Sequence, residues 1–271
     1  MDDRPIGVFD SGLGGLTAVR SLRQILPEEN LIYFGDTARV PYGGRARDTI
    51  LKYARQDVRF LRSFDLKAIL IACGTVSTTS LDTLKAENSL PIVGVVEPTC
   101  RRAVSVTKNK KVGLIATLAS VRSGAFEAVL RRLDPTVEVL GTACPLFVPL
   151  VENGRIRPGD VVIETVAREY LEPLRKTGID TLILGCTHYP LLEEIIGTIM
   201  GPEVTLVSAG EECAFELKRM LTVGDARAEE NRQGDAEFYV SDRVEDFERI
   251  ASLFLQEDLR HAARRIDIDR Y

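Results

Sequence analysis

The residues Thr181-Leu-Ile-Leu-Gly-Cys-Thr-His-Tyr-Pro190 decide the fold of this chain. The apolar run ends at Gly185, and the closing proline suits the first turn of a helix. This order predicts a buried strand, a tight turn and a helix, the unit from which parallel sheets are built. Cys186, Thr187 and His188 therefore lie at the carboxyl end of a strand, where open α/β sheets bind their ligands.

A second stretch, Ala68-Ile-Leu-Ile-Ala-Cys-Gly-Thr75, has the same order and ends its own strand at Cys73. A thiol between a strand and a helix is activated because the helix N-terminus favours the thiolate. We therefore predict that Cys73 and Cys186 are functional. The other cysteines are predicted to be small apolar core residues: Cys100, Cys144 and Cys213.

These two stretches belong to a longer repeat. Ile6-Gly-Val8 and Val112-Gly-Leu114 each open a strand–turn–helix unit before the cysteine strand. Chance can produce such matches in any alternating α/β chain, but the common order favours two similar α/β domains with mostly parallel sheets. We predict a first domain of residues 1–97 plus 208–271 and a second of residues 98–207, with one thiol on each wall of a shared cleft.

The composition narrows the class of protein. A net charge of −5 over 271 residues gives no basic footprint for nucleic acid or for an anionic membrane. Apolar runs are too short to span a bilayer, and the acidic start Met1–Arg4 does not resemble a signal peptide. Five dispersed cysteines indicate reduced thiols and a cytoplasmic location. A metal site is not expected, because Cys186 and His188 supply only two neighbouring ligands.

Three further side chains could act on the thiols. Asp10 ends the first strand, where a buried carboxylate has a functional task or caps a helix. His188 can exchange a proton with the Cys186 thiol or orient a substrate carboxylate. Glu152 lies in the segment 144–158, which its prolines and glycines predict to be an irregular loop. His261, in the charged tail, is expected at the surface.

The turn Gly12-Leu-Gly-Gly15 matches a dinucleotide fingerprint only in part, because Thr17 takes the third glycine position. Its glycines better suit the approach of backbone N–H groups to a small anion.

The tail after Asp258 is expected to be a surface helix or a frayed end. Three arginines are expected to be surface charges: Arg39, Arg45 and Arg47.

Two opposed thiols suit the inversion of a carbon centre. One thiolate removes a proton from one face while the other thiol delivers a proton to the opposite face. Hydroxyl donors at the strand–helix turns, from Ser11, Thr75 and Thr187, would stabilise the developing negative charge. A Cys–His hydrolase is an alternative, but it leaves the second cysteine without a role.

Several motifs of this chain, in this order, resemble the cofactor-independent glutamate racemases over essentially its whole length. They are Phe9-Asp-Ser-Gly-Leu-Gly-Gly15, Tyr33-Phe-Gly-Asp36, Pro41-Tyr-Gly43, Ala72-Cys73 with Thr75, Glu152, and Gly185-Cys-Thr-His-Tyr-Pro190. The resemblance implies two pseudo-two-fold related domains, an active site between them, and no metal or pyridoxal cofactor. It also implies a homodimer that supplies D-glutamate for peptidoglycan.

By the same resemblance, Cys73 exchanges the α-proton of D-glutamate with Asp10 as its auxiliary. Cys186 exchanges that of L-glutamate, assisted by His188, with Glu152 nearby. The residues implied to line the amino acid site are Asp10, Ser11, Pro41, Tyr42, Gly43, Gly74, Thr75, Thr187 and His188.

Gly74 departs from the family pattern, which usually has Asn after the first cysteine; glycine can contact substrate only through its backbone. Two alternatives stay open. The first is a racemase of aspartate or of both acidic amino acids. Aspartate is one methylene shorter than glutamate, and a pocket discriminates one methylene by about 1–3 kcal/mol of binding free energy. A binding protein that keeps the site without efficient catalysis is the other.

Overall fold

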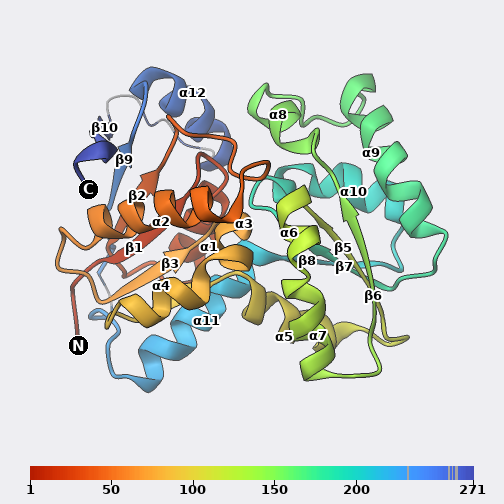
Figure 1. The fold of residues 1–271 in the computed structure, drawn as a ribbon, viewed down its shortest axis with the longest axis horizontal. Helices are drawn as coiled ribbons and strands as arrows, with labels where there is room; N and C mark the ends of the chain where they lie inside the picture. Colours follow the sequence, from red (N-terminus) through yellow and green to blue (C-terminus); the bar gives the residue numbers. More distant parts are fainter. Residues whose placement is uncertain (231, 256, 258, 260–261) are drawn as a thin grey trace.

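The computed structural model describes residues 1–230, 232–255, 257, 259 and 262–271. His261 therefore lies outside the described residues. The chain forms two lobes that lie side by side, and both termini belong to the same lobe (Figure 1). None of the helices in the described ranges is long and apolar enough to cross a membrane.

The first lobe is built around a parallel sheet with the strand order β10-β9-β2-β1-β3-β4. Its central strands are buried along their whole length, as expected for a sheet with helices on both faces. Its strands are β1 (Ile6–Asp10), β2 (Leu31–Gly35), β3 (Ala68–Ile71), β4 (Ile92–Gly94), β9 (Ala236–Val240) and β10 (Ala263–Arg265).

The second lobe is built around a smaller parallel sheet with the order β6-β5-β7-β8. The order β2-β1-β3-β4 in the first sheet is the same once each strand is matched to its counterpart. The predicted repeat is thus present in the sheet topology. The strands of the second lobe are β5 (Lys111–Ala116), β6 (Glu138–Ala143), β7 (Thr181–Leu184) and β8 (Thr205–Ser208).

The repeat places the two cysteines in equivalent positions. The last residue of β3, Ile71, pairs with β1, and Cys73 follows two residues later. The last residue of β7, Leu184, pairs with β5, and Cys186 follows two residues later. Each thiol therefore emerges beside the central strand of its own sheet, at the carboxyl edge.

Amphipathic helices cover the sheets. In α2 (Arg47–Leu61), for example, Ile50, Ala54, Val58 and Leu61 recur at helical spacing and are buried. The other helices of the first lobe are α1 (Leu16–Ile25), α3 (Gly74–Thr79), α4 (Leu81–Glu87), α11 (Ala209–Val223), α12 (Val244–Leu255) and the short η2 (Ile268–Arg270). Those of the second lobe are α6 (Leu118–Ser123), α7 (Ala125–Leu133), α8 (Phe147–Glu152), α9 (Val161–Arg175), η1 (Tyr189–Leu192) and α10 (Glu193–Met200).

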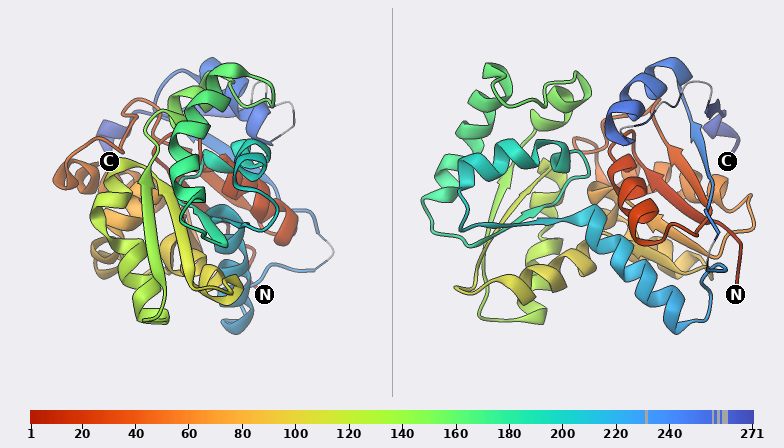
Figure 2. Two further views of the ribbon diagram at one scale, coloured as in Figure 1. Left: turned by 90° about the vertical axis from the view of Figure 1, so that its right-hand side faces the viewer. Right: turned by 180° about the vertical axis from the view of Figure 1, so that it is seen from behind.

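The connections between the lobes lie along one side of the molecule. Helix α5 (Val96–Val106) leads from β4 into the second sheet, and α11 leads back from β8. These helices pack against each other, and the rear view shows α11 running from the boundary under the first lobe (Figure 2). The carboxyl ends of both sheets are left to face a common space.

Three details differ from the sequence expectations. The segment 144–158 contains the helix α8, which is too short to show a helical period and has Pro149 inside it. The charged tail forms β10, an edge strand whose backbone pairs with β9. Arg39 is largely buried, because it pairs with Asp36 and Asp57, whereas Arg45 and Arg47 are exposed as expected.

Candidate active site

A cavity of about 410 Å³ lies between the lobes at the carboxyl ends of the strands. Both predicted thiols line it, and both are nearly buried, with exposed fractions of 4% for Cys73 and 7% for Cys186. The other predicted site residues on its wall are Ser11, Pro41, Tyr42, Gly43, Gly74, Thr75, Glu152, Thr187 and His188.

On the first wall, Cys73 is held by the turn after β1. Its thiol lies 3.3 Å from Ser11 Oγ and donates a hydrogen bond to it. Burial and the nearby Asp10 carboxylate raise the pKa of Cys73 to about 12. This thiol is therefore protonated at neutral pH and can act as a proton donor.

On the second wall, Cys186 has a charged partner. His188 Nδ1 lies 3.8 Å from Cys186 Sγ, and His188 Nε2 lies 3.0 Å from Glu152 Oε1. Burial lowers the pKa of His188, but hydrogen bonds and charge from Cys186 and Glu152 outweigh it and raise the pKa to about 10. The imidazolium can thus donate toward the sulfur and stabilise negative charge there. The two walls differ in kind, with a protonated thiol facing a thiol paired to a cation.

Asp10 does not line the cavity; it lies behind it and is almost fully buried. Its Oδ2 accepts a hydrogen bond from the Gly12 N–H at 2.9 Å, and Thr187 Oγ1 approaches its Oδ1 at 3.5 Å. Burial raises the pKa of Asp10, although the His188 charge and the turn N–H groups oppose this. The anion that the glycine turn meets is thus the chain's own carboxylate.

Close packing explains a further glycine of this turn. A Cβ on Gly14 would lie 2.5 Å from His188 Nδ1 and closer still to Thr187 Oγ1. The turn after β1 and the turn after β7 therefore touch, although they belong to different lobes. Thr17 joins them as well, since its hydroxyl donates to the Thr187 carbonyl at 2.9 Å.

Several residues of the cavity wall were missed by the sequence predictions, and two of them, Thr117 and Cys144, carry polar groups. Thr117 follows β5 as Ser11 follows β1, so the repeat itself would have indicated it. Its Oγ1 lies 3.1 Å from Thr75 Oγ1, which bridges the lobes across the cavity. Cys144 is buried as predicted, but it also lines the cavity. Burial raises the pKa of the Cys144 thiol, so it stays protonated.

Among the residues that the structure describes, no cluster of three or more His, Cys, Asp or Glu side chains is arranged to hold a metal ion. The cavity holds two thiols, each in its own electrostatic setting.

The chain is similar to known racemases in sequence and in structure. The family model described as Asp/Glu/Hydantoin racemase matches residues 16–212. The chain belongs to this racemase family. A glutamate racemase of Geobacter metallireducens is 44% identical over 93% of both chains. A crystal structure of a glutamate racemase isoform from Bacillus anthracis superposes with a TM-score of 0.93 at 38% identity, covering 98% of both chains. One from Francisella tularensis, in complex with D-glutamate, gives 0.91 at 36% identity over the full length of both.

Proposed function

We propose that this racemase-family enzyme interconverts L- and D-glutamate by proton transfer at the α-carbon between Cys73 and Cys186. The observation that carries the proposal is the presence of both thiols on one cavity, each with its own partners. Its relatives at about 40% identity are named glutamate racemases, and the cavity size suits a small amino acid.

In the proposed reaction, the His188 imidazolium stabilises the Cys186 thiolate before the reaction, and this thiolate then removes the α-proton of L-glutamate. The electron pair left on the α-carbon is delocalised into the carboxylate, which hydroxyls of Thr75, Thr117 and Thr187 can stabilise. The Cys73 thiol delivers its proton to the opposite face, which yields D-glutamate and leaves the Cys73 thiolate. The reverse reaction exchanges the roles, with Asp10 as auxiliary to Cys73.

The decisive experiment incubates the protein in D2O with L-glutamate, D-glutamate or L-aspartate. Proton NMR follows loss of the α-proton, and chiral chromatography follows the enantiomer. We expect exchange with inversion of both glutamates, and loss of inversion in Cys73→Ala and in Cys186→Ala. Exchange of aspartate alone would assign the other acidic amino acid. Full racemisation by both single variants would refute the two-thiol mechanism.

The remaining expectations stay proposals. We propose that D-glutamate feeds peptidoglycan synthesis in the cytoplasm and that the enzyme is a homodimer, which sedimentation measures directly. We also propose the domain boundaries of 1–97 plus 208–271 and 98–207. The boundary between residues 97 and 98 falls in the first turn of α5, shortly after β4 ends at Gly94, and the boundary between residues 207 and 208 falls at the end of β8, which closes at Ser208.

A further inference from the structure

Two carboxylates and one guanidinium are buried together beneath the cavity wall. Asp36 follows β2, Asp57 lies on the inner face of α2, and both side chains have an exposed fraction of 0%. Arg39 pairs with both, through Nε to Asp36 Oδ2 at 2.6 Å and through Nη2 to Asp57 Oδ1 at 3.0 Å. Its guanidinium also lies 4.3 Å from the centre of the Tyr53 ring. Two buried anions beside one cation would leave an uncompensated charge, which is costly.

The hydrogen bonds show where a compensating proton lies. Asp36 accepts from Arg39 Nε, from Ser241 Oγ at 2.8 Å and from the Tyr42 hydroxyl. The Tyr42 hydroxyl also lies 3.0 Å from Asp57 Oδ2. A phenol has only one proton, so when it donates to Asp36, the contact to Asp57 is a hydrogen bond only if Asp57 donates. The negative charge lies on Asp36, because Arg39 and Ser241 both donate to it, whereas among the described residues Asp57 has only Arg39 as a donor besides the phenol.

We propose that Asp57 is a neutral carboxylic acid that donates to Tyr42, which donates to ionised Asp36, and that this chain of hydroxyls positions the active-site segment 40–44. Burial and the Asp36 charge raise the pKa of Asp57 well above its ordinary value, with Arg39 and Tyr42 opposing. Among the described residues, the titratable groups that face Asp57 are these three, Asp36, Arg39 and Tyr42, all from the segment between β2 and α2.

The segment 40–44 connects this network to the reaction. Its residues line the cavity, and the Gly43 carbonyl accepts a hydrogen bond from the Ala119 N–H of the opposite lobe at 3.3 Å. A Cβ on Gly43 would lie 3.1 Å from Thr117. A shift of Tyr42 would therefore move the cavity wall and its contact with α6. Asp57 is a positioning residue, and this role rests on the proposed function.

The test compares three variants. Asp57→Asn keeps the shape, donates an amide N–H to Tyr42 and accepts from Arg39, so its kcat/KM should stay within about threefold of wild type. Asp57→Leu has a side chain of similar bulk that cannot donate a hydrogen bond to Tyr42. Asp36→Asn replaces one carboxylate oxygen by an amide NH2, so the Ser241 hydroxyl loses the oxygen to which it donates. Each of these two should raise KM on the order of tenfold, as expected for one lost buried hydrogen bond to a charged network.

Two readouts do not depend on racemisation. The infrared difference spectrum of wild type minus Asp57→Asn, recorded at neutral pH, should contain the C=O band of one neutral carboxylic acid. In wild type the folded state keeps a proton that the unfolded state loses above the ordinary Asp pKa. Above the ordinary Asp pKa, the equilibrium constant for unfolding of wild type should therefore rise with pH more steeply than that of Asp57→Asn, by a factor of about ten for each pH unit.

The outcomes separate the two proposals. A wild-type protein that racemises neither glutamate refutes the proposed function, while the infrared and unfolding data still decide the state of Asp57. A wild-type-minus-Asp57→Asn difference spectrum without an acid band, or an Asp57→Asn variant as impaired as Asp57→Leu, overturns the inference.

Discussion

Gly74 is a position in the cavity wall where a single methyl group should lower the racemisation rate. It is the first residue of α3 and follows Cys73 directly. A Cβ built there lies 2.5 Å from the Gly185 carbonyl oxygen, which belongs to the opposite lobe. The Gly185 peptide is held from behind, because its N–H donates to the Ile115 carbonyl at 2.8 Å. Gly74→Ala must therefore push apart the two turns that carry the thiols.

The size of the displacement follows from the contact. An ordinary Cβ contact begins at 3.4 Å, so the walls must separate by about 0.9 Å. Misplacement of reacting groups by about 1 Å can cost about 100-fold in rate. We expect kcat/KM to fall 10- to 100-fold in both directions, by order of magnitude. Without the clash, replacing glycine by alanine in a helix would instead stabilise the folded protein by about 1 kcal/mol.

The assay is racemisation of each glutamate enantiomer, with thermal unfolding as a check on folding. Gly44→Ala is the matched control, because Gly44 lines the same cavity and its Cβ would meet nothing within 4 Å. The control should keep wild-type activity. A Gly74→Ala enzyme with wild-type rates and equal or higher stability would refute the close approach as a constraint on the site.

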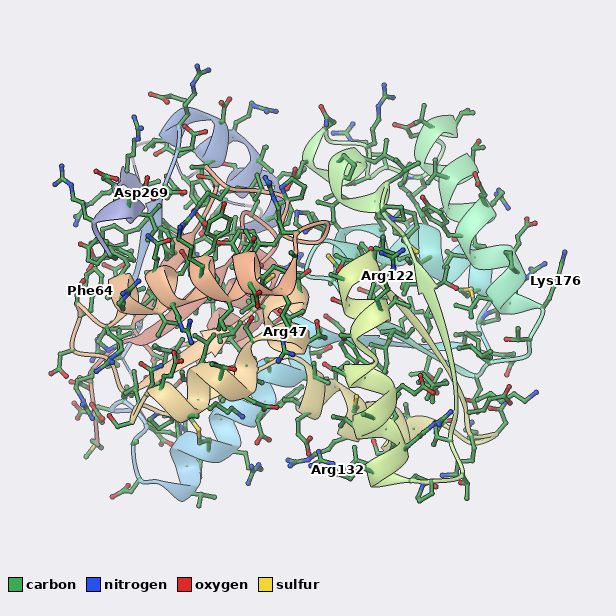
Figure 3. All side chains as sticks on the ribbon, viewed as in Figure 1. Arg47, Phe64, Arg122, Arg132, Lys176 and Asp269 are labelled. Carbon is green, nitrogen blue, oxygen red and sulfur yellow. The ribbon has the colours of Figure 1, made fainter. Side chains whose placement is uncertain are left out.

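Two further predictions use charge. Glu152→Gln removes a carboxylate that raises the pKa of His188, so this pKa should fall in the variant. The imidazolium is lost as pH rises through this pKa. The alkaline limb of the pH–rate profile with L-glutamate should therefore move to lower pH. An unmoved limb would exclude Glu152 from setting that charge. Arg122 and Arg47 lie on facing edges of the two lobes (Figure 3) and, with Arg45, line a pocket that shares Gly43, Gly44 and Leu118 with the cavity. Arg122→Ala should raise KM for glutamate severalfold at low salt and little at high salt, because an exposed cation steers an anionic substrate; equal effects at both salt concentrations would contradict steering.

The two strand–cysteine–helix units could be predicted from the amino-acid sequence. Their apolar runs and glycine breaks are local signals, so Cys73 and Cys186 could be placed at strand ends before any tertiary contact was known. The repeat of those units also predicted two similar α/β domains with mostly parallel sheets, and the structure shows that the two sheets share one strand order. Thr117 was within reach of the same reasoning, because it occupies the position of Ser11 in the second unit.

Other features depend on contacts between distant segments. The strand β10 has a charged sequence, and its place at the sheet edge comes from backbone pairing with β9, which no side-chain pattern reports. Helix α8 is a single short element containing a proline, below the length at which a period is visible.

Tertiary structure alone also decided the electrostatics. Arg39 looks like a surface charge in the sequence, and it is largely buried because Asp36 and Asp57 pair with it and the Tyr53 ring packs against it. The contact of Gly74 with Gly185 likewise arises only when the lobes close on each other. Periodicity reports which face of an element is buried, whereas the charge of a thiol or carboxylate depends on what packs against it from elsewhere in the chain.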